Sequence, residues 1–343
     1  ILPGMYHDLR TAVRDGFSQA RAELEELVRI PSVSAPGFDP GQVRRSAERI
    51  GELLEASGFS NVRLLEIDGA HPAIYGEIPA PEGAPTVLLY AHHDVQPPGP
   101  EEEWETTPFD PIERDGRLLG RGSADDKCGV VMHVAAVRAF GGDVPVGVKV
   151  FMEGEEEIGS ANLGAFLDEH QGLLAADVIV IGDAGNWAVG RPALTTSLRG
   201  LVDCIIEVRT LESPVHSWMF GGPIPDAITV LARVVASLHD ERGNVAVEGL
   251  VQAPAGRADL SEAEFRSQAG TVESLRLLGD DSLTDRLWYR PAISVLAIDA
   301  PPISEAINQL VPTARAKVSM RIAPGQDPQT ALAALSAHLE KNV

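Results

Sequence analysis

The sequence has few cysteines, few basic residues relative to its acids, and no long apolar run. Its two cysteines, Cys128 and Cys204, exclude a disulfide-stapled scaffold and fit a reducing, cytoplasmic setting. With 28 Lys and Arg against 50 Asp and Glu, the formal net charge of −22 argues against nucleic acid or an anionic membrane as partner. Apolar runs such as Val178–Ile181 are strand-sized, and no secretory signal is visible, so a membrane span is not expected.

The first part of the chain alternates helical and strand-like segments, and 343 residues are enough for two domains. This alternation predicts an α/β domain over residues 1–194, in which helices flank a central, mostly parallel sheet. The last three expected strands are apolar enough to be covered on both faces. The segments are helices at His7–Val28, Arg44–Ala56, Lys127–Phe140 and Leu163–His170, and strands at Val62–Ile67, Thr86–Tyr90, Val146–Met152 and Val178–Ile181.

The pattern changes at about Thr195, which predicts a second, α+β domain over residues 195–343. Its order, β-α-β-β-α, is that of a ferredoxin-like unit without its closing strand. The chain is therefore expected to be C-terminally truncated, with its last strand missing. The segments are strands at Gly200–Arg209, Ala292–Ile298 and Arg315–Ile322, and helices at Asp226–Leu238 and Pro328–Glu340.

Candidate metal ligands follow the expected strands of the first domain. His92, Glu156 and Asp183 each come shortly after a strand-like segment. Because ligands of α/β sheets collect beyond the carboxyl ends of the strands, these side chains are expected at one edge of the sheet. A solvated loop or a turn explains each of them taken alone. Their common position favours a metal site.

Two further acids lie in a glycine-rich turn at the start of an expected helix. A carboxylate can bridge two cations about 3.5–4 Å apart, and we favour this role for Asp125. For Asp126, an N-cap explains the residue equally well, since Asp is favoured there on capping grounds alone. Asp94, two residues after His92, can hold the non-ligating ring nitrogen of that histidine.

Four acids are crowded into the segment Glu153–Glu157. They repel one another unless positive charge compensates them, so a division of labour is plausible. One glutamate would coordinate metal, and its neighbour would take a proton from the attacking water.

These motifs carry a family resemblance over nearly the whole chain. Tyr90–Pro97, Gly120–Lys127 and Glu153–Ser160 resemble the three signature stretches of the di-zinc metallopeptidase family of carnosinases, cytosolic non-specific dipeptidases, acetylornithine deacetylases and succinyl-diaminopimelate desuccinylases. The similarity is strongest toward the dipeptidase branch, through Arg290–Pro291. It implies a zinc-peptidase-like catalytic domain over residues 1–194 and a lid or dimerisation domain over residues 195–343.

The resemblance implies a role for each motif residue. His92 and Asp183 would bind one zinc, Glu157 would bind the other, and Asp125 would bridge them. The peptide between Asp125 and Asp126 is expected to be cis. The two remaining residues are Asp94, which would orient His92, and Glu156, which would be the general base.

The resemblance also implies three functional residues in the second domain. His216, in the segment Ser213–Ser217, would stabilise the oxyanion in the active site of a partner subunit. Asn308 would hold the substrate carbonyl, and Arg321 the C-terminal carboxylate, which suits a planar guanidinium. Taken without the family, His216 is a turn histidine and Arg321 a solvent-facing strand residue, and the match is loosest at Asn308.

The function implied is hydrolysis of dipeptides or short peptides by a cytoplasmic homodimer with two zinc ions per subunit, although manganese or cobalt could serve. An N-acyl amino acid deacylase or desuccinylase of the same family is the first alternative. The second is a catalytically impaired dimerisation fragment, because the family's final histidine ligand, expected to bind the zinc held by Glu157, is absent along with the rest of the catalytic domain.

Overall fold

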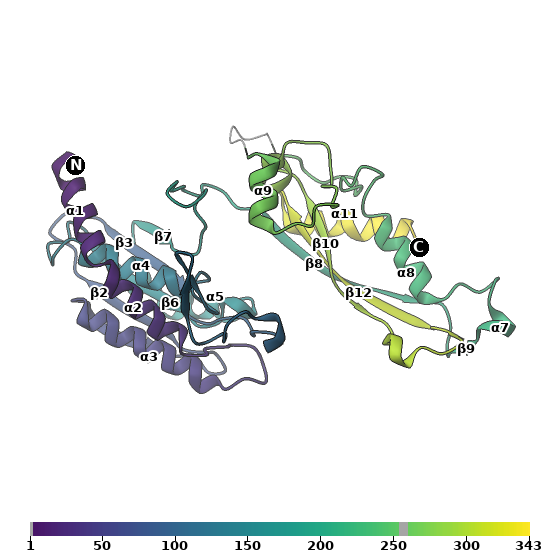
Figure 1. The fold of residues 1–343 in the computed structure, drawn as a ribbon, viewed down its shortest axis with the longest axis horizontal. Helices are drawn as coiled ribbons and strands as arrows, with labels where there is room; N and C mark the ends of the chain where they lie inside the picture. Colours follow the sequence, from purple (N-terminus) through teal and green to yellow (C-terminus); the bar gives the residue numbers. More distant parts are fainter. Residues whose placement is uncertain (1–2, 254–259) are drawn as a thin grey trace. The chain divides into compact units, whose positions relative to one another are not determined.

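The computed structural model describes residues 3–253 and 260–343. The chain forms two compact units, Ile1–Ala193 (unit 1) and Leu194–Val343 (unit 2) (Figure 1). Unit 1 is built of alternating helices and strands and unit 2 of a sheet with helices on one face. The predicted α/β fold class is therefore confirmed.

Unit 1 has a five-stranded mixed sheet in the order β1-β2-β6-β3-β7. β3 pairs in parallel with both β6 and β7, whereas β1-β2 and β2-β6 are antiparallel. The parallel trio brings three strand ends to one edge of the sheet. The strands are β1 (Ser60–Leu65), β2 (Ala73–Ile78), β3 (Thr86–His92), β6 (Gly147–Glu153) and β7 (Val178–Ile181), and a hairpin of β4 (Ile112–Arg114) and β5 (Arg117–Leu119) lies outside the sheet.

Helices cover both faces of this sheet. On one face α2, α3 and α4 bury a core that includes Ile50, Leu54, Val130 and Met152. On the other face α5 and α6 contribute to a smaller cluster around Phe151. The helices are α1 (Pro3–Asp15), α2 (Phe17–Val28), α3 (Pro40–Ala56), α4 (Lys127–Arg138), α5 (Leu163–Glu169) and α6 (Gln171–Leu174), with short 3₁₀ turns η1 (Glu101–Glu103) and η2 (Glu156–Ile158).

Two helix boundaries differ from the sequence prediction. The single helix expected at His7–Val28 is two helices that meet at Gly16, where glycine lowers the helix propensity. α3 begins at Pro40 rather than Arg44, because Asp39 caps it by accepting a hydrogen bond from the Gly41 amide and proline is tolerated in the first turn.

The prediction for β7 was wrong in one respect. This strand lies at the end of the sheet order and, among the described strands, pairs with β3 alone. Its four apolar side chains are 43–62% exposed, so it is not an interior strand covered on both faces. An apolar run of four residues indicates a strand, but it does not specify what covers that strand.

Unit 2 contains a three-stranded antiparallel sheet in the order β10-β12-β8. α8 and α11 cover one face, where residues such as Leu231, Val318 and Leu335 are buried. The elements of this layer are β8 (Gly200–Arg209), α8 (Ala227–Ala236), β10 (Ala292–Asp299), β12 (Thr313–Ile322) and α11 (Pro328–Lys341).

Smaller elements complete unit 2. Two short helices, α9 (Glu262–Ala269) and α10 (Leu283–Trp288), follow α8 in the sequence. A small strand pair lies at one end of the unit, beside α7 (Figure 1). The pair consists of β9 (Val215–His216) and β11 (Gln309–Leu310); α7 (Ser217–Phe220) follows β9, and the turn η3 (Ile303–Glu305) comes just before β11. Among the described residues, no helix is long and apolar enough to cross a bilayer.

Candidate metal centre and active site

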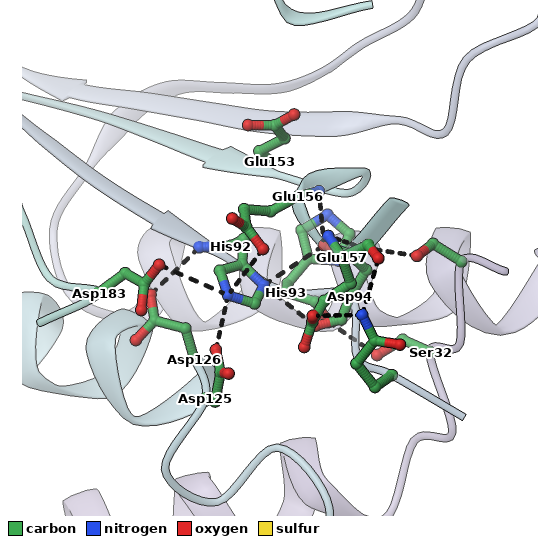
Figure 2. A network of polar contacts seen from close by, with 12 residues as sticks. Ser32, His92, His93, Asp94, Asp125, Asp126, Glu153, Glu156, Glu157 and Asp183 are labelled. Carbon is green, nitrogen blue, oxygen red and sulfur yellow. Dashed lines mark hydrogen bonds and ion pairs between the residues drawn. The ribbon is translucent and has the colours of Figure 1, made fainter. Parts of the chain in front are cut away.

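The parallel trio β6-β3-β7 and the start of α4 together position the candidate site. His92 is the last residue of β3, and Asp183 lies two residues after the end of β7. Glu156 begins the turn η2 just after β6, and Asp125 precedes α4. Figure 2 shows these side chains pointing toward one another across the edge of the sheet. The predicted clustering of polar side chains at strand ends is thus what the structure contains.

His92 is the centre of this cluster. Its Nε2 lies 2.9 Å from Oδ1 of Asp125, 3.8 Å from Oε2 of Glu156 and 4.0 Å from Oδ2 of Asp183 (Figure 2). One ligand atom each of His92, Asp125 and Asp183 lies within 4.8 Å of the others. Since imidazole nitrogen and carboxylate oxygen are both zinc ligands, this group has the donor set of a divalent cation site.

The acids clustered around His92 shift the pKa values of the site residues. Burial lowers the pKa of His92, but the hydrogen bond and charge of Asp94, with the charges of Asp126 and Glu156, raise it to about 10. Burial raises the pKa of Glu156, the charge of His92 opposes this rise, and the charges of Glu157 and Asp183 add to it. The acids around His92 therefore favour positive charge at this position, and a divalent cation would supply it.

Asp94 contacts both His92 and the turn η2, which carries Glu156 and Glu157. Its carboxylate is fully buried and lies 3.4 Å from Nδ1 of His92. Its oxygens accept hydrogen bonds from the amides of Glu156 at 3.2 Å and Glu157 at 3.1 Å, and from Oγ of Ser34 at 2.6 Å. Burial acts to raise the pKa of Asp94, but its bonds to His92 and Ser34 lower it below the usual value. The ionised carboxylate fixes the ring and the turn together.

Asp126 caps α4. Its side chain accepts a hydrogen bond from the Gly129 amide, and a Cβ at Gly129 would lie 2.3 Å from Oδ1 of Asp126, so glycine is required there. The peptide between Asp125 and Asp126 is cis, as expected. The next residue, Lys127, is fully buried and donates to the carbonyls of Leu27 and Ile30. These contacts fix the turn that presents Asp125.

Glu157 is held apart from the three-residue group. Gln96 donates from Nε2 to both the carbonyl oxygen and Oε2 of Glu157, each at 2.8 Å. Burial, and then the charges of Asp125 and Asp94, act to raise the pKa of Glu157, while the Gln96 bond lowers it, with a net rise. Glu157 therefore lies among the acids but does not belong to the group around His92 and Asp183.

The other two acids of the crowded segment have structural partners. Oε2 of Glu153 accepts a hydrogen bond from the Tyr90 hydroxyl at 2.7 Å. Glu155 accepts hydrogen bonds from the His71 amide at 2.7 Å and from Nδ2 of Asn162 at 2.9 Å. This leaves Glu156 and Glu157 as the glutamates available for chemistry.

The residues predicted in unit 2 fall in two places. His216 lies opposite Gln309 in the β9-β11 pair, and the Ser217 amide donates to the carbonyl of Asn308 at 3.1 Å. His216 and Asn308 are thus neighbours. Arg321 lies near the far end of β12 and is exposed.

Three residues of the site had no predicted role. Ser34 binds Asp94 from a position 60 residues earlier in the chain, and no local pattern signals such a contact. Gln96 belongs to the His92 motif, but its partner, Glu157, is 61 residues away. Gly129 had a signal in principle, since it lies three residues after a capping acid at the start of an apolar helix.

The chain matches the model of Peptidase family M20/M25/M40 over residues 88–340. It is 40% identical over 306 residues to a cysteinylglycine-S-conjugate dipeptidase of Corynebacterium striatum, which covers 88% of this chain and 67% of that protein. It is 30% identical to a beta-Ala-His dipeptidase of Rattus norvegicus, covering 78% of this chain and 58% of that protein.

Solved structures agree with these sequence matches. An M20 family metallo-carboxypeptidase, Sso-CP2 of Sulfolobus solfataricus, superposes with a TM-score of 0.79 at 27% identity, covering 94% of this chain and 75% of that one. The chain thus spans about three fifths to three quarters of the length of these proteins.

Proposed function

The chain belongs to peptidase family M20/M25/M40, and on this premise we propose that it hydrolyses dipeptides with the help of bound metal. The observation that carries the proposal is the convergence of His92, Asp125 and Asp183 within 4.8 Å, with Glu156 beside the same imidazole. The dipeptidases among its relatives support the substrate class. A metal cofactor follows from the family and the donor set, and we propose two zinc ions per subunit, with manganese or cobalt as possible replacements.

In this proposal each acid has its own task. His92, Asp125 and Asp183 would hold one cation, and Glu157, with Asp125, would contribute to binding the second. When bound, such cations lower the pKa of water and polarise a carbonyl group. Glu156, whose side chain is 39% exposed, takes the proton of the attacking water and passes it to the leaving amine. Asp94 fixes the orientation of the His92 ring and the position of the turn η2.

The residues of unit 2 support a homodimer. Thr313, the first residue of β12, follows β11 closely in the chain. Since a strand rises about 3.3 Å per residue, Arg321 lies roughly 26 Å along β12 from Thr313. An extended dipeptide spans about 7 Å. Asn308 and His216 of one chain therefore cannot reach the same dipeptide as Arg321 of that chain. We propose that His216 and Asn308 complete the active site of a partner subunit, with Arg321 holding the substrate carboxylate.

Hydrolysis assays with and without metal test this proposal. Zinc-loaded protein should cleave unmodified dipeptides, and removal of the metal with a chelator should abolish the activity until zinc is restored. A panel of N-acyl amino acids should be cleaved far more slowly. Cleavage of the N-acyl panel alone would replace the dipeptidase proposal by a deacylase, and cleavage of neither panel would refute both. The two free cysteines support a cytoplasmic location as part of the same proposal.

A further inference from the structure

Two arginines lie side by side at one end of the unit 2 sheet. In the β8-β12 register Arg321 is opposite Leu201. Arg199 is two residues before Leu201 and so lies on the same face, diagonal to Arg321. Diagonal neighbours in an antiparallel pair are about 7–8 Å apart, within reach of long side chains. Two guanidinium groups therefore share one patch of surface.

The backbone at this point is built for close approach. Gly200 begins β8 opposite Ile322, and a Cβ at Gly200 would lie 2.8 Å from Cγ1 of Ile322. A larger residue would push the start of β8 away from the end of β12. Glycine at this position therefore keeps Arg199 next to Arg321.

Neither arginine has an acidic partner in the part of the chain that the structure describes. The other basic residues of β12 do: Arg315 pairs with Asp299 at 2.6 Å, and Lys317 with Asp203 at 3.7 Å. Within residues 3–253 and 260–343, no ion pair involves Arg199 or Arg321, and the buried Nη1 of Arg199 has no acceptor. The two basic residues in the first half of the strand are neutralised, and the one near its end is not.

This absence is unexpected in a chain with 50 acids and 28 bases. Burial, and then the charge of Arg321, lower the pKa of Arg199, so the pair is unfavourable as it stands. A half-buried cation without a partner lowers the stability of a fold unless a ligand supplies the opposite charge. The missing component is an anion, and a planar fork of donors matches a carboxylate.

We propose that Arg199 and Arg321 together bind the C-terminal carboxylate of the substrate. This assignment rests on the proposed dipeptidase function and extends it, since Arg199 had no role from sequence. Two guanidinium groups on one carboxylate require a substrate whose C-terminus is free. The enzyme therefore selects dipeptides over dipeptide amides and over peptides extended at that end.

Substitution of Arg199 tests, through KM, whether the two arginines form a clamp on the substrate carboxylate. Arg199→Gln should raise KM for a dipeptide by about 10- to 100-fold, the effect of one charged hydrogen-bonding group, and leave kcat/KM for the matching dipeptide amide unchanged. Arg199→Lys should restore part of the loss. Arg315→Gln, on the same strand but paired with Asp299, is the matched control and should change neither substrate. An equal loss on acid and amide would refute the clamp.

A thermal melt separates binding from a structural role. Because Arg199 is an unpaired cation beside another, Arg199→Gln should leave Tm unchanged or raise it. A lower Tm together with equal losses on both substrates would assign Arg199 to folding. If the wild-type protein cleaves no dipeptide, the dipeptidase proposal fails on its own. Calorimetry with glycine as a carboxylate probe then decides the clamp, which stands only if wild type binds and Arg199→Gln does not.

Discussion

The metal centre of unit 1 and the candidate residues of unit 2 differ in how they are held. In unit 1, His92 and Asp94 are fully buried, and Asp94 receives hydrogen bonds from two amides and a serine. In unit 2, His216 and Arg321 are exposed, and Arg321 has no partner among the described residues. The first group is preorganised by the chain itself. The second group is not held in this way, which agrees with the proposal that it meets a substrate or a second subunit.

The largest loss of activity is expected from substitution of Glu156, the proposed general base in unit 1. Glu156→Gln keeps the shape and the backbone amide that binds Asp94 but cannot accept a proton. Turnover of dipeptides should fall by about 10²–10⁴-fold, the usual contribution of a general base. Zinc content, measured by elemental analysis, should stay at the wild-type value. Turnover within a few fold of wild type would remove Glu156 from the role of base.

A smaller loss of activity is expected from substitution of His216 in unit 2. His216→Ala should lower kcat by about 10²–10³-fold, as for loss of one oxyanion donor. If the histidine acts in a partner subunit, mixing His216→Ala with Glu156→Gln should regain activity, because half of the sites in a mixed dimer then have both groups. Sedimentation should show a dimer in each sample. Dimeric mixtures with no regained activity would place His216 outside the partner's site.

Ser34 tests how far the outer contacts preorganise the metal centre. Ser34→Ala leaves Asp94 with its amide donors but removes the 2.6 Å hydroxyl contact. Zinc affinity, measured by competition with a chelator, should fall by about tenfold or more, in line with other outer partners of metal ligands. Ser18→Ala, an exposed serine of α2, is the control. Equal zinc affinity in Ser34→Ala and wild type would show that the amides alone fix Asp94.

The smallest effect concerns His93, which is buried and neutral. Burial lowers its pKa to about 4, below the 6.5 of the unfolded chain, so the unfolded state binds more protons between these values. The folded state should therefore lose about 2 kcal/mol from this group between pH 7 and pH 5. Urea unfolding of wild type and His93→Gln at both pH values measures it. A variant with the same pH dependence as wild type would contradict the assignment.

Much of the site in unit 1 could be predicted from sequence because one rule applies to it. Each apolar segment of strand length ends in a histidine or an acid, and parallel pairing brings those ends together. The rule does not say which of the four acids in Glu153–Glu157 take part in catalysis. That distinction came from Tyr90 and Asn162, which hold Glu153 and Glu155 from elsewhere in the fold.

The remaining errors have physical causes of the same kind. The exposure of β7 depends on what packs against it, and periodicity carries no such information. The break at Gly16 required a choice between one long helix and two short ones that tertiary packing decides. Arg199 had no predicted role, because its position beside Arg321 is visible only once the neighbouring strand is in place.

The central claim is that the group formed by His92, Asp125 and Asp183 holds a divalent cation, and zinc titration of matched variants tests it most directly. Asp183→Asn should weaken zinc binding by more than the roughly tenfold loss typical of outer partners, measured by calorimetry. Asp143→Asn, an exposed acid after α4, should bind zinc as wild type does. Equal zinc affinity in Asp183→Asn and wild type would contradict the account.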